Sequence, residues 1–275
     1  MKTIKTVIAT AAMLGFTATA SAAILTNSDG NFDFGGFDWD SAGSVWIDGY
    51  NITSGMALGT TDNFTMYYQA NATSVKNSAG VSYTGAAMSG LNSIYEYTIT
   101  ATIQEQVTCI VANCSVVQID IIGGTWDIWY DAASANSSQA LGTGFVDGVK
   151  LLSGTFLGSP ISDSLIGAQG PTNPGNVVLA GVFAGQVTYT NLDFLTPALA
   201  DTLAVSTLQF GNRTTDWTRP ANFDGVGAPG DDTNTSFVGQ ADANQTFLVP
   251  EPGSLALLGL GLGLAGLIGR RRTAA

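Results

Sequence analysis

Carboxylates are the side chains of this sequence whose number and spacing could do chemistry. Between residues 23 and 248 lie eighteen aspartates but only two glutamates, Glu96 and Glu105. Two carboxylates in one cleft can hydrolyse a glycosidic bond, one as acid and the other as base or nucleophile. The odd separation of the two glutamates places them on opposite faces of an unbroken strand. They are therefore not predicted to act as a pair, and two converging aspartates remain the alternative.

Histidine is absent from the chain. This absence excludes Ser-His-Asp triads and Cys-His pairs, because both need an imidazole base. The sequence therefore predicts no catalytic residue and no enzyme activity.

Oxygen ligands for calcium occur at both ends of the 23–248 region. An EF-hand loop is excluded, because its sixth position needs glycine and this sequence has Phe32 there. A structural calcium ion that tightens loops stays open as an alternative to no cofactor at all, since Asp and Asn are also common loop residues. The residues that could contribute are Asn27, Asp29, Asn31, Asp33, Asp38, Asp40, Asp231 and Asp232.

The 23–248 region is strongly acidic. It carries twenty acidic side chains against four basic ones, Lys76, Lys150, Arg213 and Arg219. Such a surface repels phosphate backbones, so nucleic acid is excluded as a partner.

The first 22 residues have the pattern of a secretory signal peptide. Lys2 and Lys5 precede an apolar stretch, and Ala20 and Ala22 form a small-residue cleavage site before Ala23. The protein is therefore predicted to be exported. In an exported protein, the close pair Cys109 and Cys114 predicts a disulfide, with free thiols as the alternative.

The chain ends in a short apolar run followed by positive charge. Fourteen uncharged residues, 255–268, precede Arg270, Arg271 and Arg272. A membrane span usually needs about 20 residues, with a lower limit near 17. The arginines predict a cytoplasmic end for this marginal helix, so the bulk of the protein would lie outside.

Val249, Pro250, Glu251 and Pro252, followed by this Gly/Leu-rich run and the arginine cluster, resemble the PEP-CTERM sorting signal of exopolysaccharide-making Gram-negative bacteria. The resemblance implies recognition by an exosortase, a membrane enzyme that resembles proteases and transpeptidases and leaves the helix behind. It also implies transient anchoring in the inner membrane, then placement at the cell surface or in the extracellular matrix.

Several segments before the tail are similar to the flocculation-associated PEP-CTERM proteins: 63–70, 91–100, 142–156 and 239–247. This second resemblance implies a secreted protein needed for cells to aggregate in an exopolysaccharide matrix. It implies no catalytic residues. A glycan-binding or glycan-hydrolysing protein of the same matrix is the alternative function.

The elements that must position these residues are predicted to be strands. Residues 94–107 alternate, with Tyr95, Tyr97, Ile99, Ala101, Ile103 and Val107 on one face and mainly polar residues on the other. The strand 115–122 follows, so the two cysteines should flank the turn of a hairpin. Further strands are predicted at 44–50, 63–70, 125–131, 148–156, 176–190 and 202–210.

Many short strands separated by turn residues predict a mainly β fold, an antiparallel β-sandwich or related barrel, with an N-terminal signal helix and a C-terminal hydrophobic helix. Any helix between these two ends should be short. The predicted organisation is a signal peptide (1–22), a β-rich extracellular domain (23–220), a Gly/Asp/Asn-rich stalk (221–248) and a sorting signal with a transmembrane helix (249–275).

Aromatic residues on these strands allow two interpretations. Trp126 and Tyr130 should share one strand face and Trp129 the other, while Tyr67 and Tyr68 should point oppositely. Outward-pointing rings could form a platform for sugars, whereas inward-pointing rings complete the core. The predicted function is an exported matrix or cell-surface protein that promotes exopolysaccharide-dependent aggregation.

Overall fold

The computed structural model describes residues 23–83, 85–132, 135–158, 164–168, 179–210, 217–233 and 235–248. The predicted signal peptide, with Ala20 and Ala22, and the predicted sorting signal, with residues 249–252 and 270–272, lie outside the described residues. Within the described ranges, no helix is long and apolar enough to cross a membrane.

The described residues form mainly strands and loops, and two short 3-10 helices, η1 (Gly85–Met88) and η2 (Ala112–Cys114), lie in the connections. The strands are β1 (Ala23–Asn27), β2 (Gly30–Phe34), β3 (Gly36–Trp39), β4 (Gly43–Asp48), β5 (Thr61–Lys76), β6 (Glu96–Cys109), β7 (Val116–Asp131), β8 (Val149–Phe156), β9 (Ser164–Ala168), β10 (Leu179–Thr190), β11 (Leu195–Thr196), β12 (Leu203–Phe210) and β13 (Ser236–Leu248).

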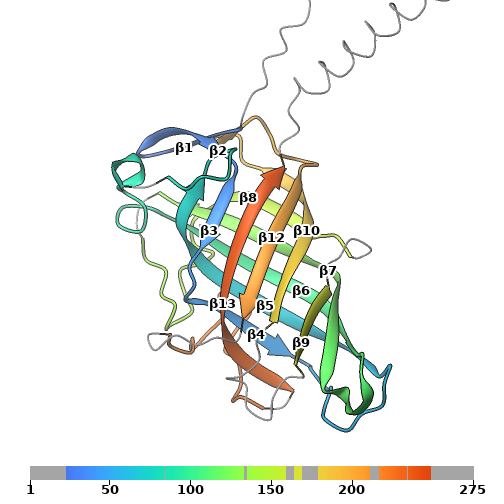
Figure 1. Cartoon of the computed structure of the whole chain (residues 1–275). Helices are drawn as coiled ribbons and strands as arrows, with labels where there is room; N and C mark the ends of the chain where they lie inside the picture. The colour runs from blue at the N-terminus through green and yellow to red at the C-terminus, as the bar shows by residue number, and fades with distance from the viewer. Residues whose placement is uncertain are drawn as a thin grey trace, which may run out of the picture. The chain divides into compact units, whose positions relative to one another are not determined.

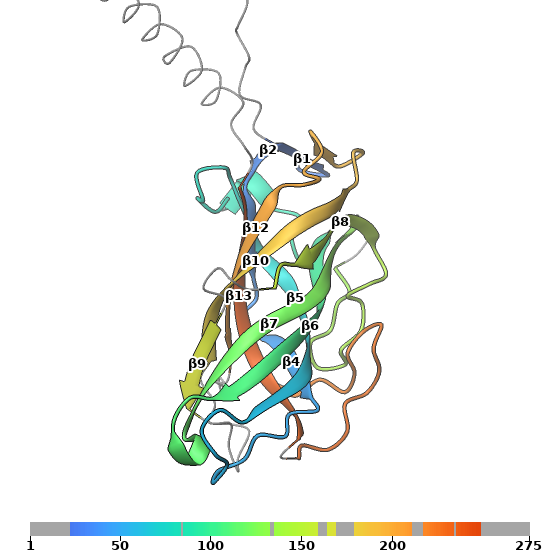
Figure 2. The same cartoon turned by 90° about the vertical axis from the view of Figure 1, so that its right-hand side faces the viewer.

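The main sheet is antiparallel and continuous around the domain. Its strands follow the order β12-β10-β8-β7-β6-β5-β3-β13-β4, and the additional pairings β12–β13 and β5–β4 close it. Figures 1 and 2 show that it is flattened into two layers, with β3, β13, β12 and β10 facing β5 to β8. The predicted antiparallel sandwich is confirmed. A smaller sheet, in the order β11-β1-β2, lies at one end of the molecule (Figure 1).

The core fills the space between the two layers. It follows from period-two alternation, because every second side chain of a strand points to the same face. Trp126 of β7 contacts Phe247 of β13 across the core, with ring centroids 6.0 Å apart. Burial of a large apolar side chain contributes roughly 1.5–3 kcal/mol each, so these aromatic contacts hold the layers together.

One glycine allows the core tryptophan to fit. A Cβ at Gly154 would lie 2.1 Å from Cζ2 of Trp126 and 2.6 Å from the carbonyl oxygen of Gln186. Any larger residue would therefore displace either the indole or the neighbouring strand β10.

Strand β6 confirms the predicted alternation. The residues from Tyr95 to Val107 that were assigned to the apolar face are all buried. The predicted strands 115–122 and 125–131 are in fact one continuous strand, β7, so the prediction of two separate strands is wrong. β7 passes through Gly123 and Gly124 with a register shift opposite Gln104 and Glu105. Gly124 has a φ of +134°, and a Cβ there would meet the Thr102 carbonyl oxygen.

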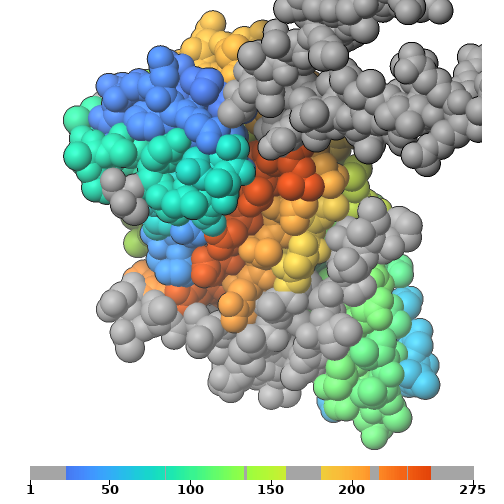
Figure 3. Space-filling model, turned by 45° about the horizontal axis from the view of Figure 1, so that its top comes forward, coloured from blue at the N-terminus to red at the C-terminus, as the bar shows by residue number. Residues whose placement is uncertain are grey.

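The predicted disulfide and hairpin are confirmed. Cys109 and Cys114 are bonded, and their Cα atoms lie 4.8 Å apart at the turn between β6 and β7. The hairpin end stands out from the body of the domain as a green projection in Figure 3, beside the start of β5.

The prediction of a stalk over 221–248 is wrong. Residues Ser236–Leu248 form β13, which pairs with β12 on one side and with β3 and β4 on the other. The inner face of β13 carries the small residues Ala241 and Ala243 together with Phe237 and Phe247, and Phe247 packs against Trp126 of the facing layer. The small residues gave the segment the composition of a linker.

Candidate functional site

The outer face of the layer β5 to β8 carries an ordered array of polar and aromatic side chains. Cross-strand pairing joins Trp46, Tyr67, Thr102, Thr125 and Thr155 in one row across five strands. A second row joins Ser44, Gln69, Thr100, Asp127 and Ser153. Directly opposed residues have Cβ atoms about 4.5–5.5 Å apart, so each row forms a continuous surface.

Two loops lie over part of this face. Figure 2 shows them on the outer side of β5 to β7, the 135–148 loop in yellow-green and the 217–235 loop in orange. The loops also bond to each other, because the Ala221 N–H donates to the Ala140 carbonyl at 2.9 Å. These loops cover part of the polar face of β6. The alternation of residues along the strand does not reveal this cover.

Buried polar side chains on the strands hold the first loop in place. Oε1 of Glu96, a residue that is 2% exposed, accepts hydrogen bonds from the Asn136 and Ser137 N–H groups at 2.8 Å each. The Thr98 hydroxyl donates to the Phe145 carbonyl at 2.7 Å. These strand residues therefore position the 135–148 loop.

Gln69 holds the second loop. Its side chain is buried, donates to the Asn222 carbonyl at 3.1 Å and accepts from the Asp224 N–H at 2.9 Å. Asp224 in turn accepts from the Phe145 N–H at 2.8 Å and so links the two loops. A neutral amide that satisfies two backbone groups is well suited to fix a loop over a sheet.

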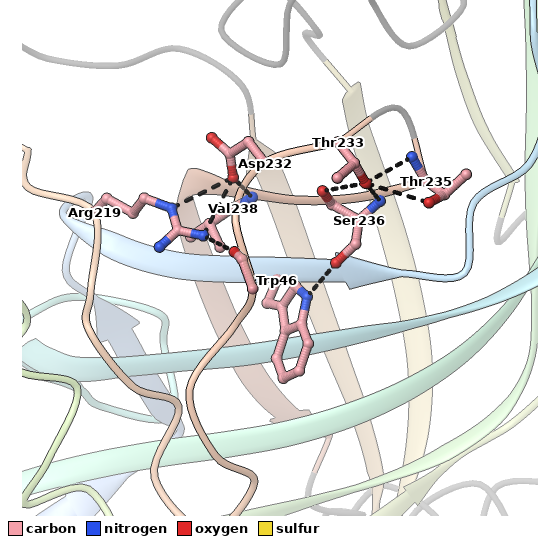
Figure 4. A network of polar contacts seen from close by, with 8 residues as sticks. Trp46, Arg219, Asp232, Thr233, Thr235, Ser236 and Val238 are labelled. Atoms are coloured by element: carbon pink, nitrogen blue, oxygen red, sulfur yellow. Dashed lines mark hydrogen bonds and ion pairs between the residues drawn. The ribbon is translucent and has the colours of Figure 1, made fainter.

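A further polar network fixes the base of the second loop (Figure 4). The Arg219 guanidinium donates to the Gly230 carbonyl at 2.5 Å and pairs with Asp232 at 3.4 Å. Asp232 also accepts from the Val238 N–H at 3.0 Å, at the start of β13. Trp46 donates to the Ser236 hydroxyl at 2.8 Å.

Between the loops and the sheet lies a groove of about 350 Å³, which we call the outer groove. Its floor is formed by strand residues and its roof by the two loops. The floor contains Tyr67, Thr100, Thr102, Thr125, Asp127 and Trp129, and the roof contains Val146, Phe223, Asp224, Gly225 and Val226. Binding sites for small ligands typically have volumes of about 300–1,000 Å³.

Aromatic rings stand at both sides of the outer groove. Tyr67 packs against Trp46 with ring centroids 5.0 Å apart, and Trp46 lies 5.9 Å from the ring of Phe223 in the roof. On the other side, the Lys150 ammonium lies 4.7 Å from the centroid of the Trp129 ring. Packing thus holds these rings in defined positions.

The polar groups of the groove fall into two sets. Asp127 is already engaged, because it pairs with Lys150 at 3.0 Å and accepts from the Ser153 hydroxyl at 2.5 Å. By contrast, the Trp129 Nε1–H is buried and has no partner among the described residues. Thr100, Thr102 and Thr125 add hydroxyl groups at their centre. The groove therefore offers donors and acceptors between apolar walls.

The two glutamates are on opposite faces of β6, as predicted. Glu96 points to the loops, whereas Glu105 points into the core, where it is 1% exposed. Burial raises the pKa of Glu105 to about 8. The carboxylates that line the outer groove are instead those of Asp127 and Asp224.

The residues considered for calcium near the start of the domain have protein partners. Asp29 accepts from the Tyr95 hydroxyl and the Gly90 N–H, both at 2.9 Å, and Asp33 accepts from the Ser78 hydroxyl at 2.6 Å. Burial, followed by the nearby charges of Asp38 and Asp40, raises the pKa of Asp242. In the part of the chain that the structure describes, no group of three or more His, Cys, Asp or Glu residues could hold a metal ion.

The aromatic predictions divide between core and surface. Trp126, Tyr130 and Tyr68 are buried, whereas Tyr67 and Trp129 lie on the outer face. The opposite directions agree with the predicted alternation, and the structure shows which ring of each pair is outside. The roof residues Phe223 to Val226 were missed, because their segment was assigned to a stalk. The Phe223 side chain within this polar segment was the signal that could have indicated a packed loop.

The PEP-CTERM protein-sorting motif matches residues 248–272 of the chain. No curated protein and no solved structure matches it. The matched residues include the Val-Pro-Glu-Pro sequence and the arginine cluster on which the first resemblance rested. The motif implies processing by an exosortase, a membrane enzyme. The chain thus carries a PEP-CTERM sorting signal, and it is an exosortase-sorted protein that crosses the membrane to the cell surface or the extracellular space.

Proposed function

We propose that the sorted protein promotes exopolysaccharide-dependent cell aggregation, and that it does so by binding glycan chains in the outer groove. The single observation that carries the proposal is the groove itself, in which aromatic rings flank a floor of hydroxyl groups. Sugar rings present apolar faces and hydroxyl edges, so rings and hydroxyls together match their chemistry. The sorting signal supports delivery to the place where such glycans occur.

Hydrolysis of the glycan is the second candidate, because Asp127 and Asp224 line one groove. Both carboxylates already hold groups of the protein, Asp127 through Lys150 and Ser153 and Asp224 through the Phe145 N–H. We therefore propose binding without catalysis. Release of new reducing ends from exopolysaccharide by the purified protein would favour the hydrolase instead.

The proposal is tested first by substitution in the groove. Trp129→Ala is expected to weaken binding to the exopolysaccharide of the producing cells at least tenfold, or about 1.4 kcal/mol. Tyr189→Ala is the matched control, because Tyr189 is an exposed aromatic residue on β10 that does not line the groove. Isothermal titration of the full-length proteins measures both. Equal affinity of wild type and Trp129→Ala would reject the groove as the glycan site.

Gln69→Ala tests whether the roof is needed. Loss of its two hydrogen bonds releases the 222–224 segment while leaving Tyr67 and Trp129 in place. We expect weaker glycan binding, with near-native resistance of the domain to proteolysis. Unchanged affinity would show that the floor alone binds.

The cellular role is tested by deleting the gene and measuring floc formation. Full-length protein should restore flocs, whereas Trp129→Ala and a variant lacking residues 250–275 should not. Rescue by Trp129→Ala would separate aggregation from the groove. Rescue by the truncated variant would make the sorting signal dispensable for aggregation.

A further inference from the structure

We infer that the outer groove selects uncharged sugar rings and rejects glycans that carry carboxylate, sulfate or phosphate groups. This inference rests on the proposed glycan-binding function and names the class of ligand. It follows from where the few basic residues lie and what each of them already contacts.

Lys150 is the basic residue next to the groove, and its charge is already engaged. Its ammonium lies 3.0 Å from Asp127 Oδ1 and also lies over the Trp129 ring. An acidic sugar that recruited Lys150 would have to break an ion pair in the floor. Recognition of anionic groups usually depends on basic side chains that are free to form charge-assisted hydrogen bonds.

The other basic residues within the described ranges are engaged as well. Lys76 pairs with Asp38 at 3.5 Å and donates to Asn244. Arg219 pairs with Asp232 and donates to the Gly230 carbonyl at the base of the second loop. Moving either side chain toward an anionic ligand would release a loop or strand contact.

The charges that line the groove are negative. Asp127 lies in the floor, where Lys150 offsets its charge, and Asp224 lies in the roof, where it accepts from the Phe145 N–H, so the charge that a ligand meets in the roof is negative. The 23–248 region adds a long-range field of the same sign, with twenty acidic side chains against four basic ones. Like charges inside a partly desolvated groove repel more strongly than they do in water.

The remaining contacts suit hydroxyl groups. Thr100, Thr102 and Thr125 supply hydroxyl groups that can donate or accept. An uncharged sugar ring can use all of these groups without breaking an ion pair. Neutral rings are therefore the class that the groove accommodates at least cost.

The test compares fractions of one exopolysaccharide. The exopolysaccharide of the producing cells is separated by anion exchange into neutral and acidic fractions, and part of the acidic fraction is carboxyl-reduced to neutral sugars. Full-length protein should bind the neutral fraction at least tenfold more tightly than the acidic one. Carboxyl reduction should raise the affinity of the acidic fraction. The preference should shrink between 0.05 M and 0.5 M salt, because ions screen the repulsion.

Two variants separate the possible outcomes. Asp224→Asn keeps an acceptor for the Phe145 N–H but removes a charge, so it should narrow the preference for the neutral fraction. Trp129→Ala identifies binding that occurs in the groove. If the acidic fraction binds as tightly as the neutral fraction or more tightly, and this binding depends on Trp129, the inference about charge is overturned while the glycan-binding function stands. If neither fraction binds in a Trp129-dependent way, the glycan-binding function itself is rejected, together with the inference.

Discussion

At the scale of single residues, the two glutamates show how position decides the role of a carboxylate. Glu96 and Glu105 lie on one strand, β6, and differ only in the face from which they project. Glu96 accepts hydrogen bonds from two backbone N–H groups, which stabilise its carboxylate. Glu105 Oε1 has no partner among the described residues, and burial raises the pKa of this carboxyl to about 8.

The raised pKa of the Glu105 carboxyl predicts that the free energy of unfolding depends on pH. The pKa of its carboxyl is near 4.5 when the residue is exposed and about 8 in the folded state, so the folded state holds a proton that the unfolded state has lost. The free energy of unfolding should therefore fall as pH rises between these values, by up to about 1.4 kcal/mol per pH unit. Because the chain lacks histidine, no imidazole titrates in this window.

Glu105→Gln should remove most of this slope, since glutamine does not ionise. Urea unfolding at pH 5, 6, 7 and 8 measures it. Gln104→Glu, which adds a carboxylate on the exposed side of the same strand, is the control and should keep the wild-type slope. Equal slopes in wild type and Glu105→Gln would mean that Glu105 ionises in the folded state as freely as in water.

At the scale of elements, the β6–β7 hairpin is held by both pairing and a disulfide. The register is set by paired residues from Glu96 to Cys109, so the bond between Cys109 and Cys114 secures an end that the ladder already aligns. The loop that the disulfide closes is short, and short loops have little entropy to lose.

Replacing both cysteines by alanine should therefore cost about 2 kcal/mol or less of unfolding free energy. Guanidinium unfolding of the oxidised wild type and of the double variant gives the difference. The wild type treated with reductant serves as a second measure of the same loss. A variant that fails to fold would show that the disulfide is needed to form the hairpin at all.

At the scale of the whole molecule, the last described strand completes the sheet. β13 lies between β12 and the strands β3 and β4, so it joins the end of the domain to its beginning. Phe247 packs against Phe34 with ring centroids 5.4 Å apart, near the start of the domain. The fold therefore reaches to Leu248, immediately before the residues of the sorting sequence.

Deleting residues 236–248 while keeping 249–275 should therefore prevent folding, because β12, β3 and β4 each lose one of the strands with which they pair. Resistance of the exported protein to proteolysis measures the outcome. A Gly/Ser linker inserted after Leu248 is the control and should be tolerated, since it breaks no strand pairing. A protease-resistant deletion variant would show that β13 is dispensable.

The sequence alone determined the strands with regular alternation, such as β6, because its inner face is apolar except at Glu105 and its outer face is mostly polar. It also determined the disulfide pair and the sorting motif, since each is a local pattern that needs no distant partner. Only the tertiary structure decided that β13 is a strand rather than a stalk. Ala241 and Ala243 are buried because β13 pairs with β12, β3 and β4, and these pairings join parts of the chain that are distant in sequence.

The outer groove was likewise decided by tertiary contacts. Alternation separated Tyr67 from Tyr68 and Trp129 from Trp126, but it did not indicate which ring of each pair lies outside the core or whether anything covers that ring. The roof comes from loops distant in the chain, and Gln69 reaches Asn222 and Asp224 across more than 150 residues. A site assembled by such contacts leaves no local pattern, because each residue separately has the composition of an ordinary strand or turn.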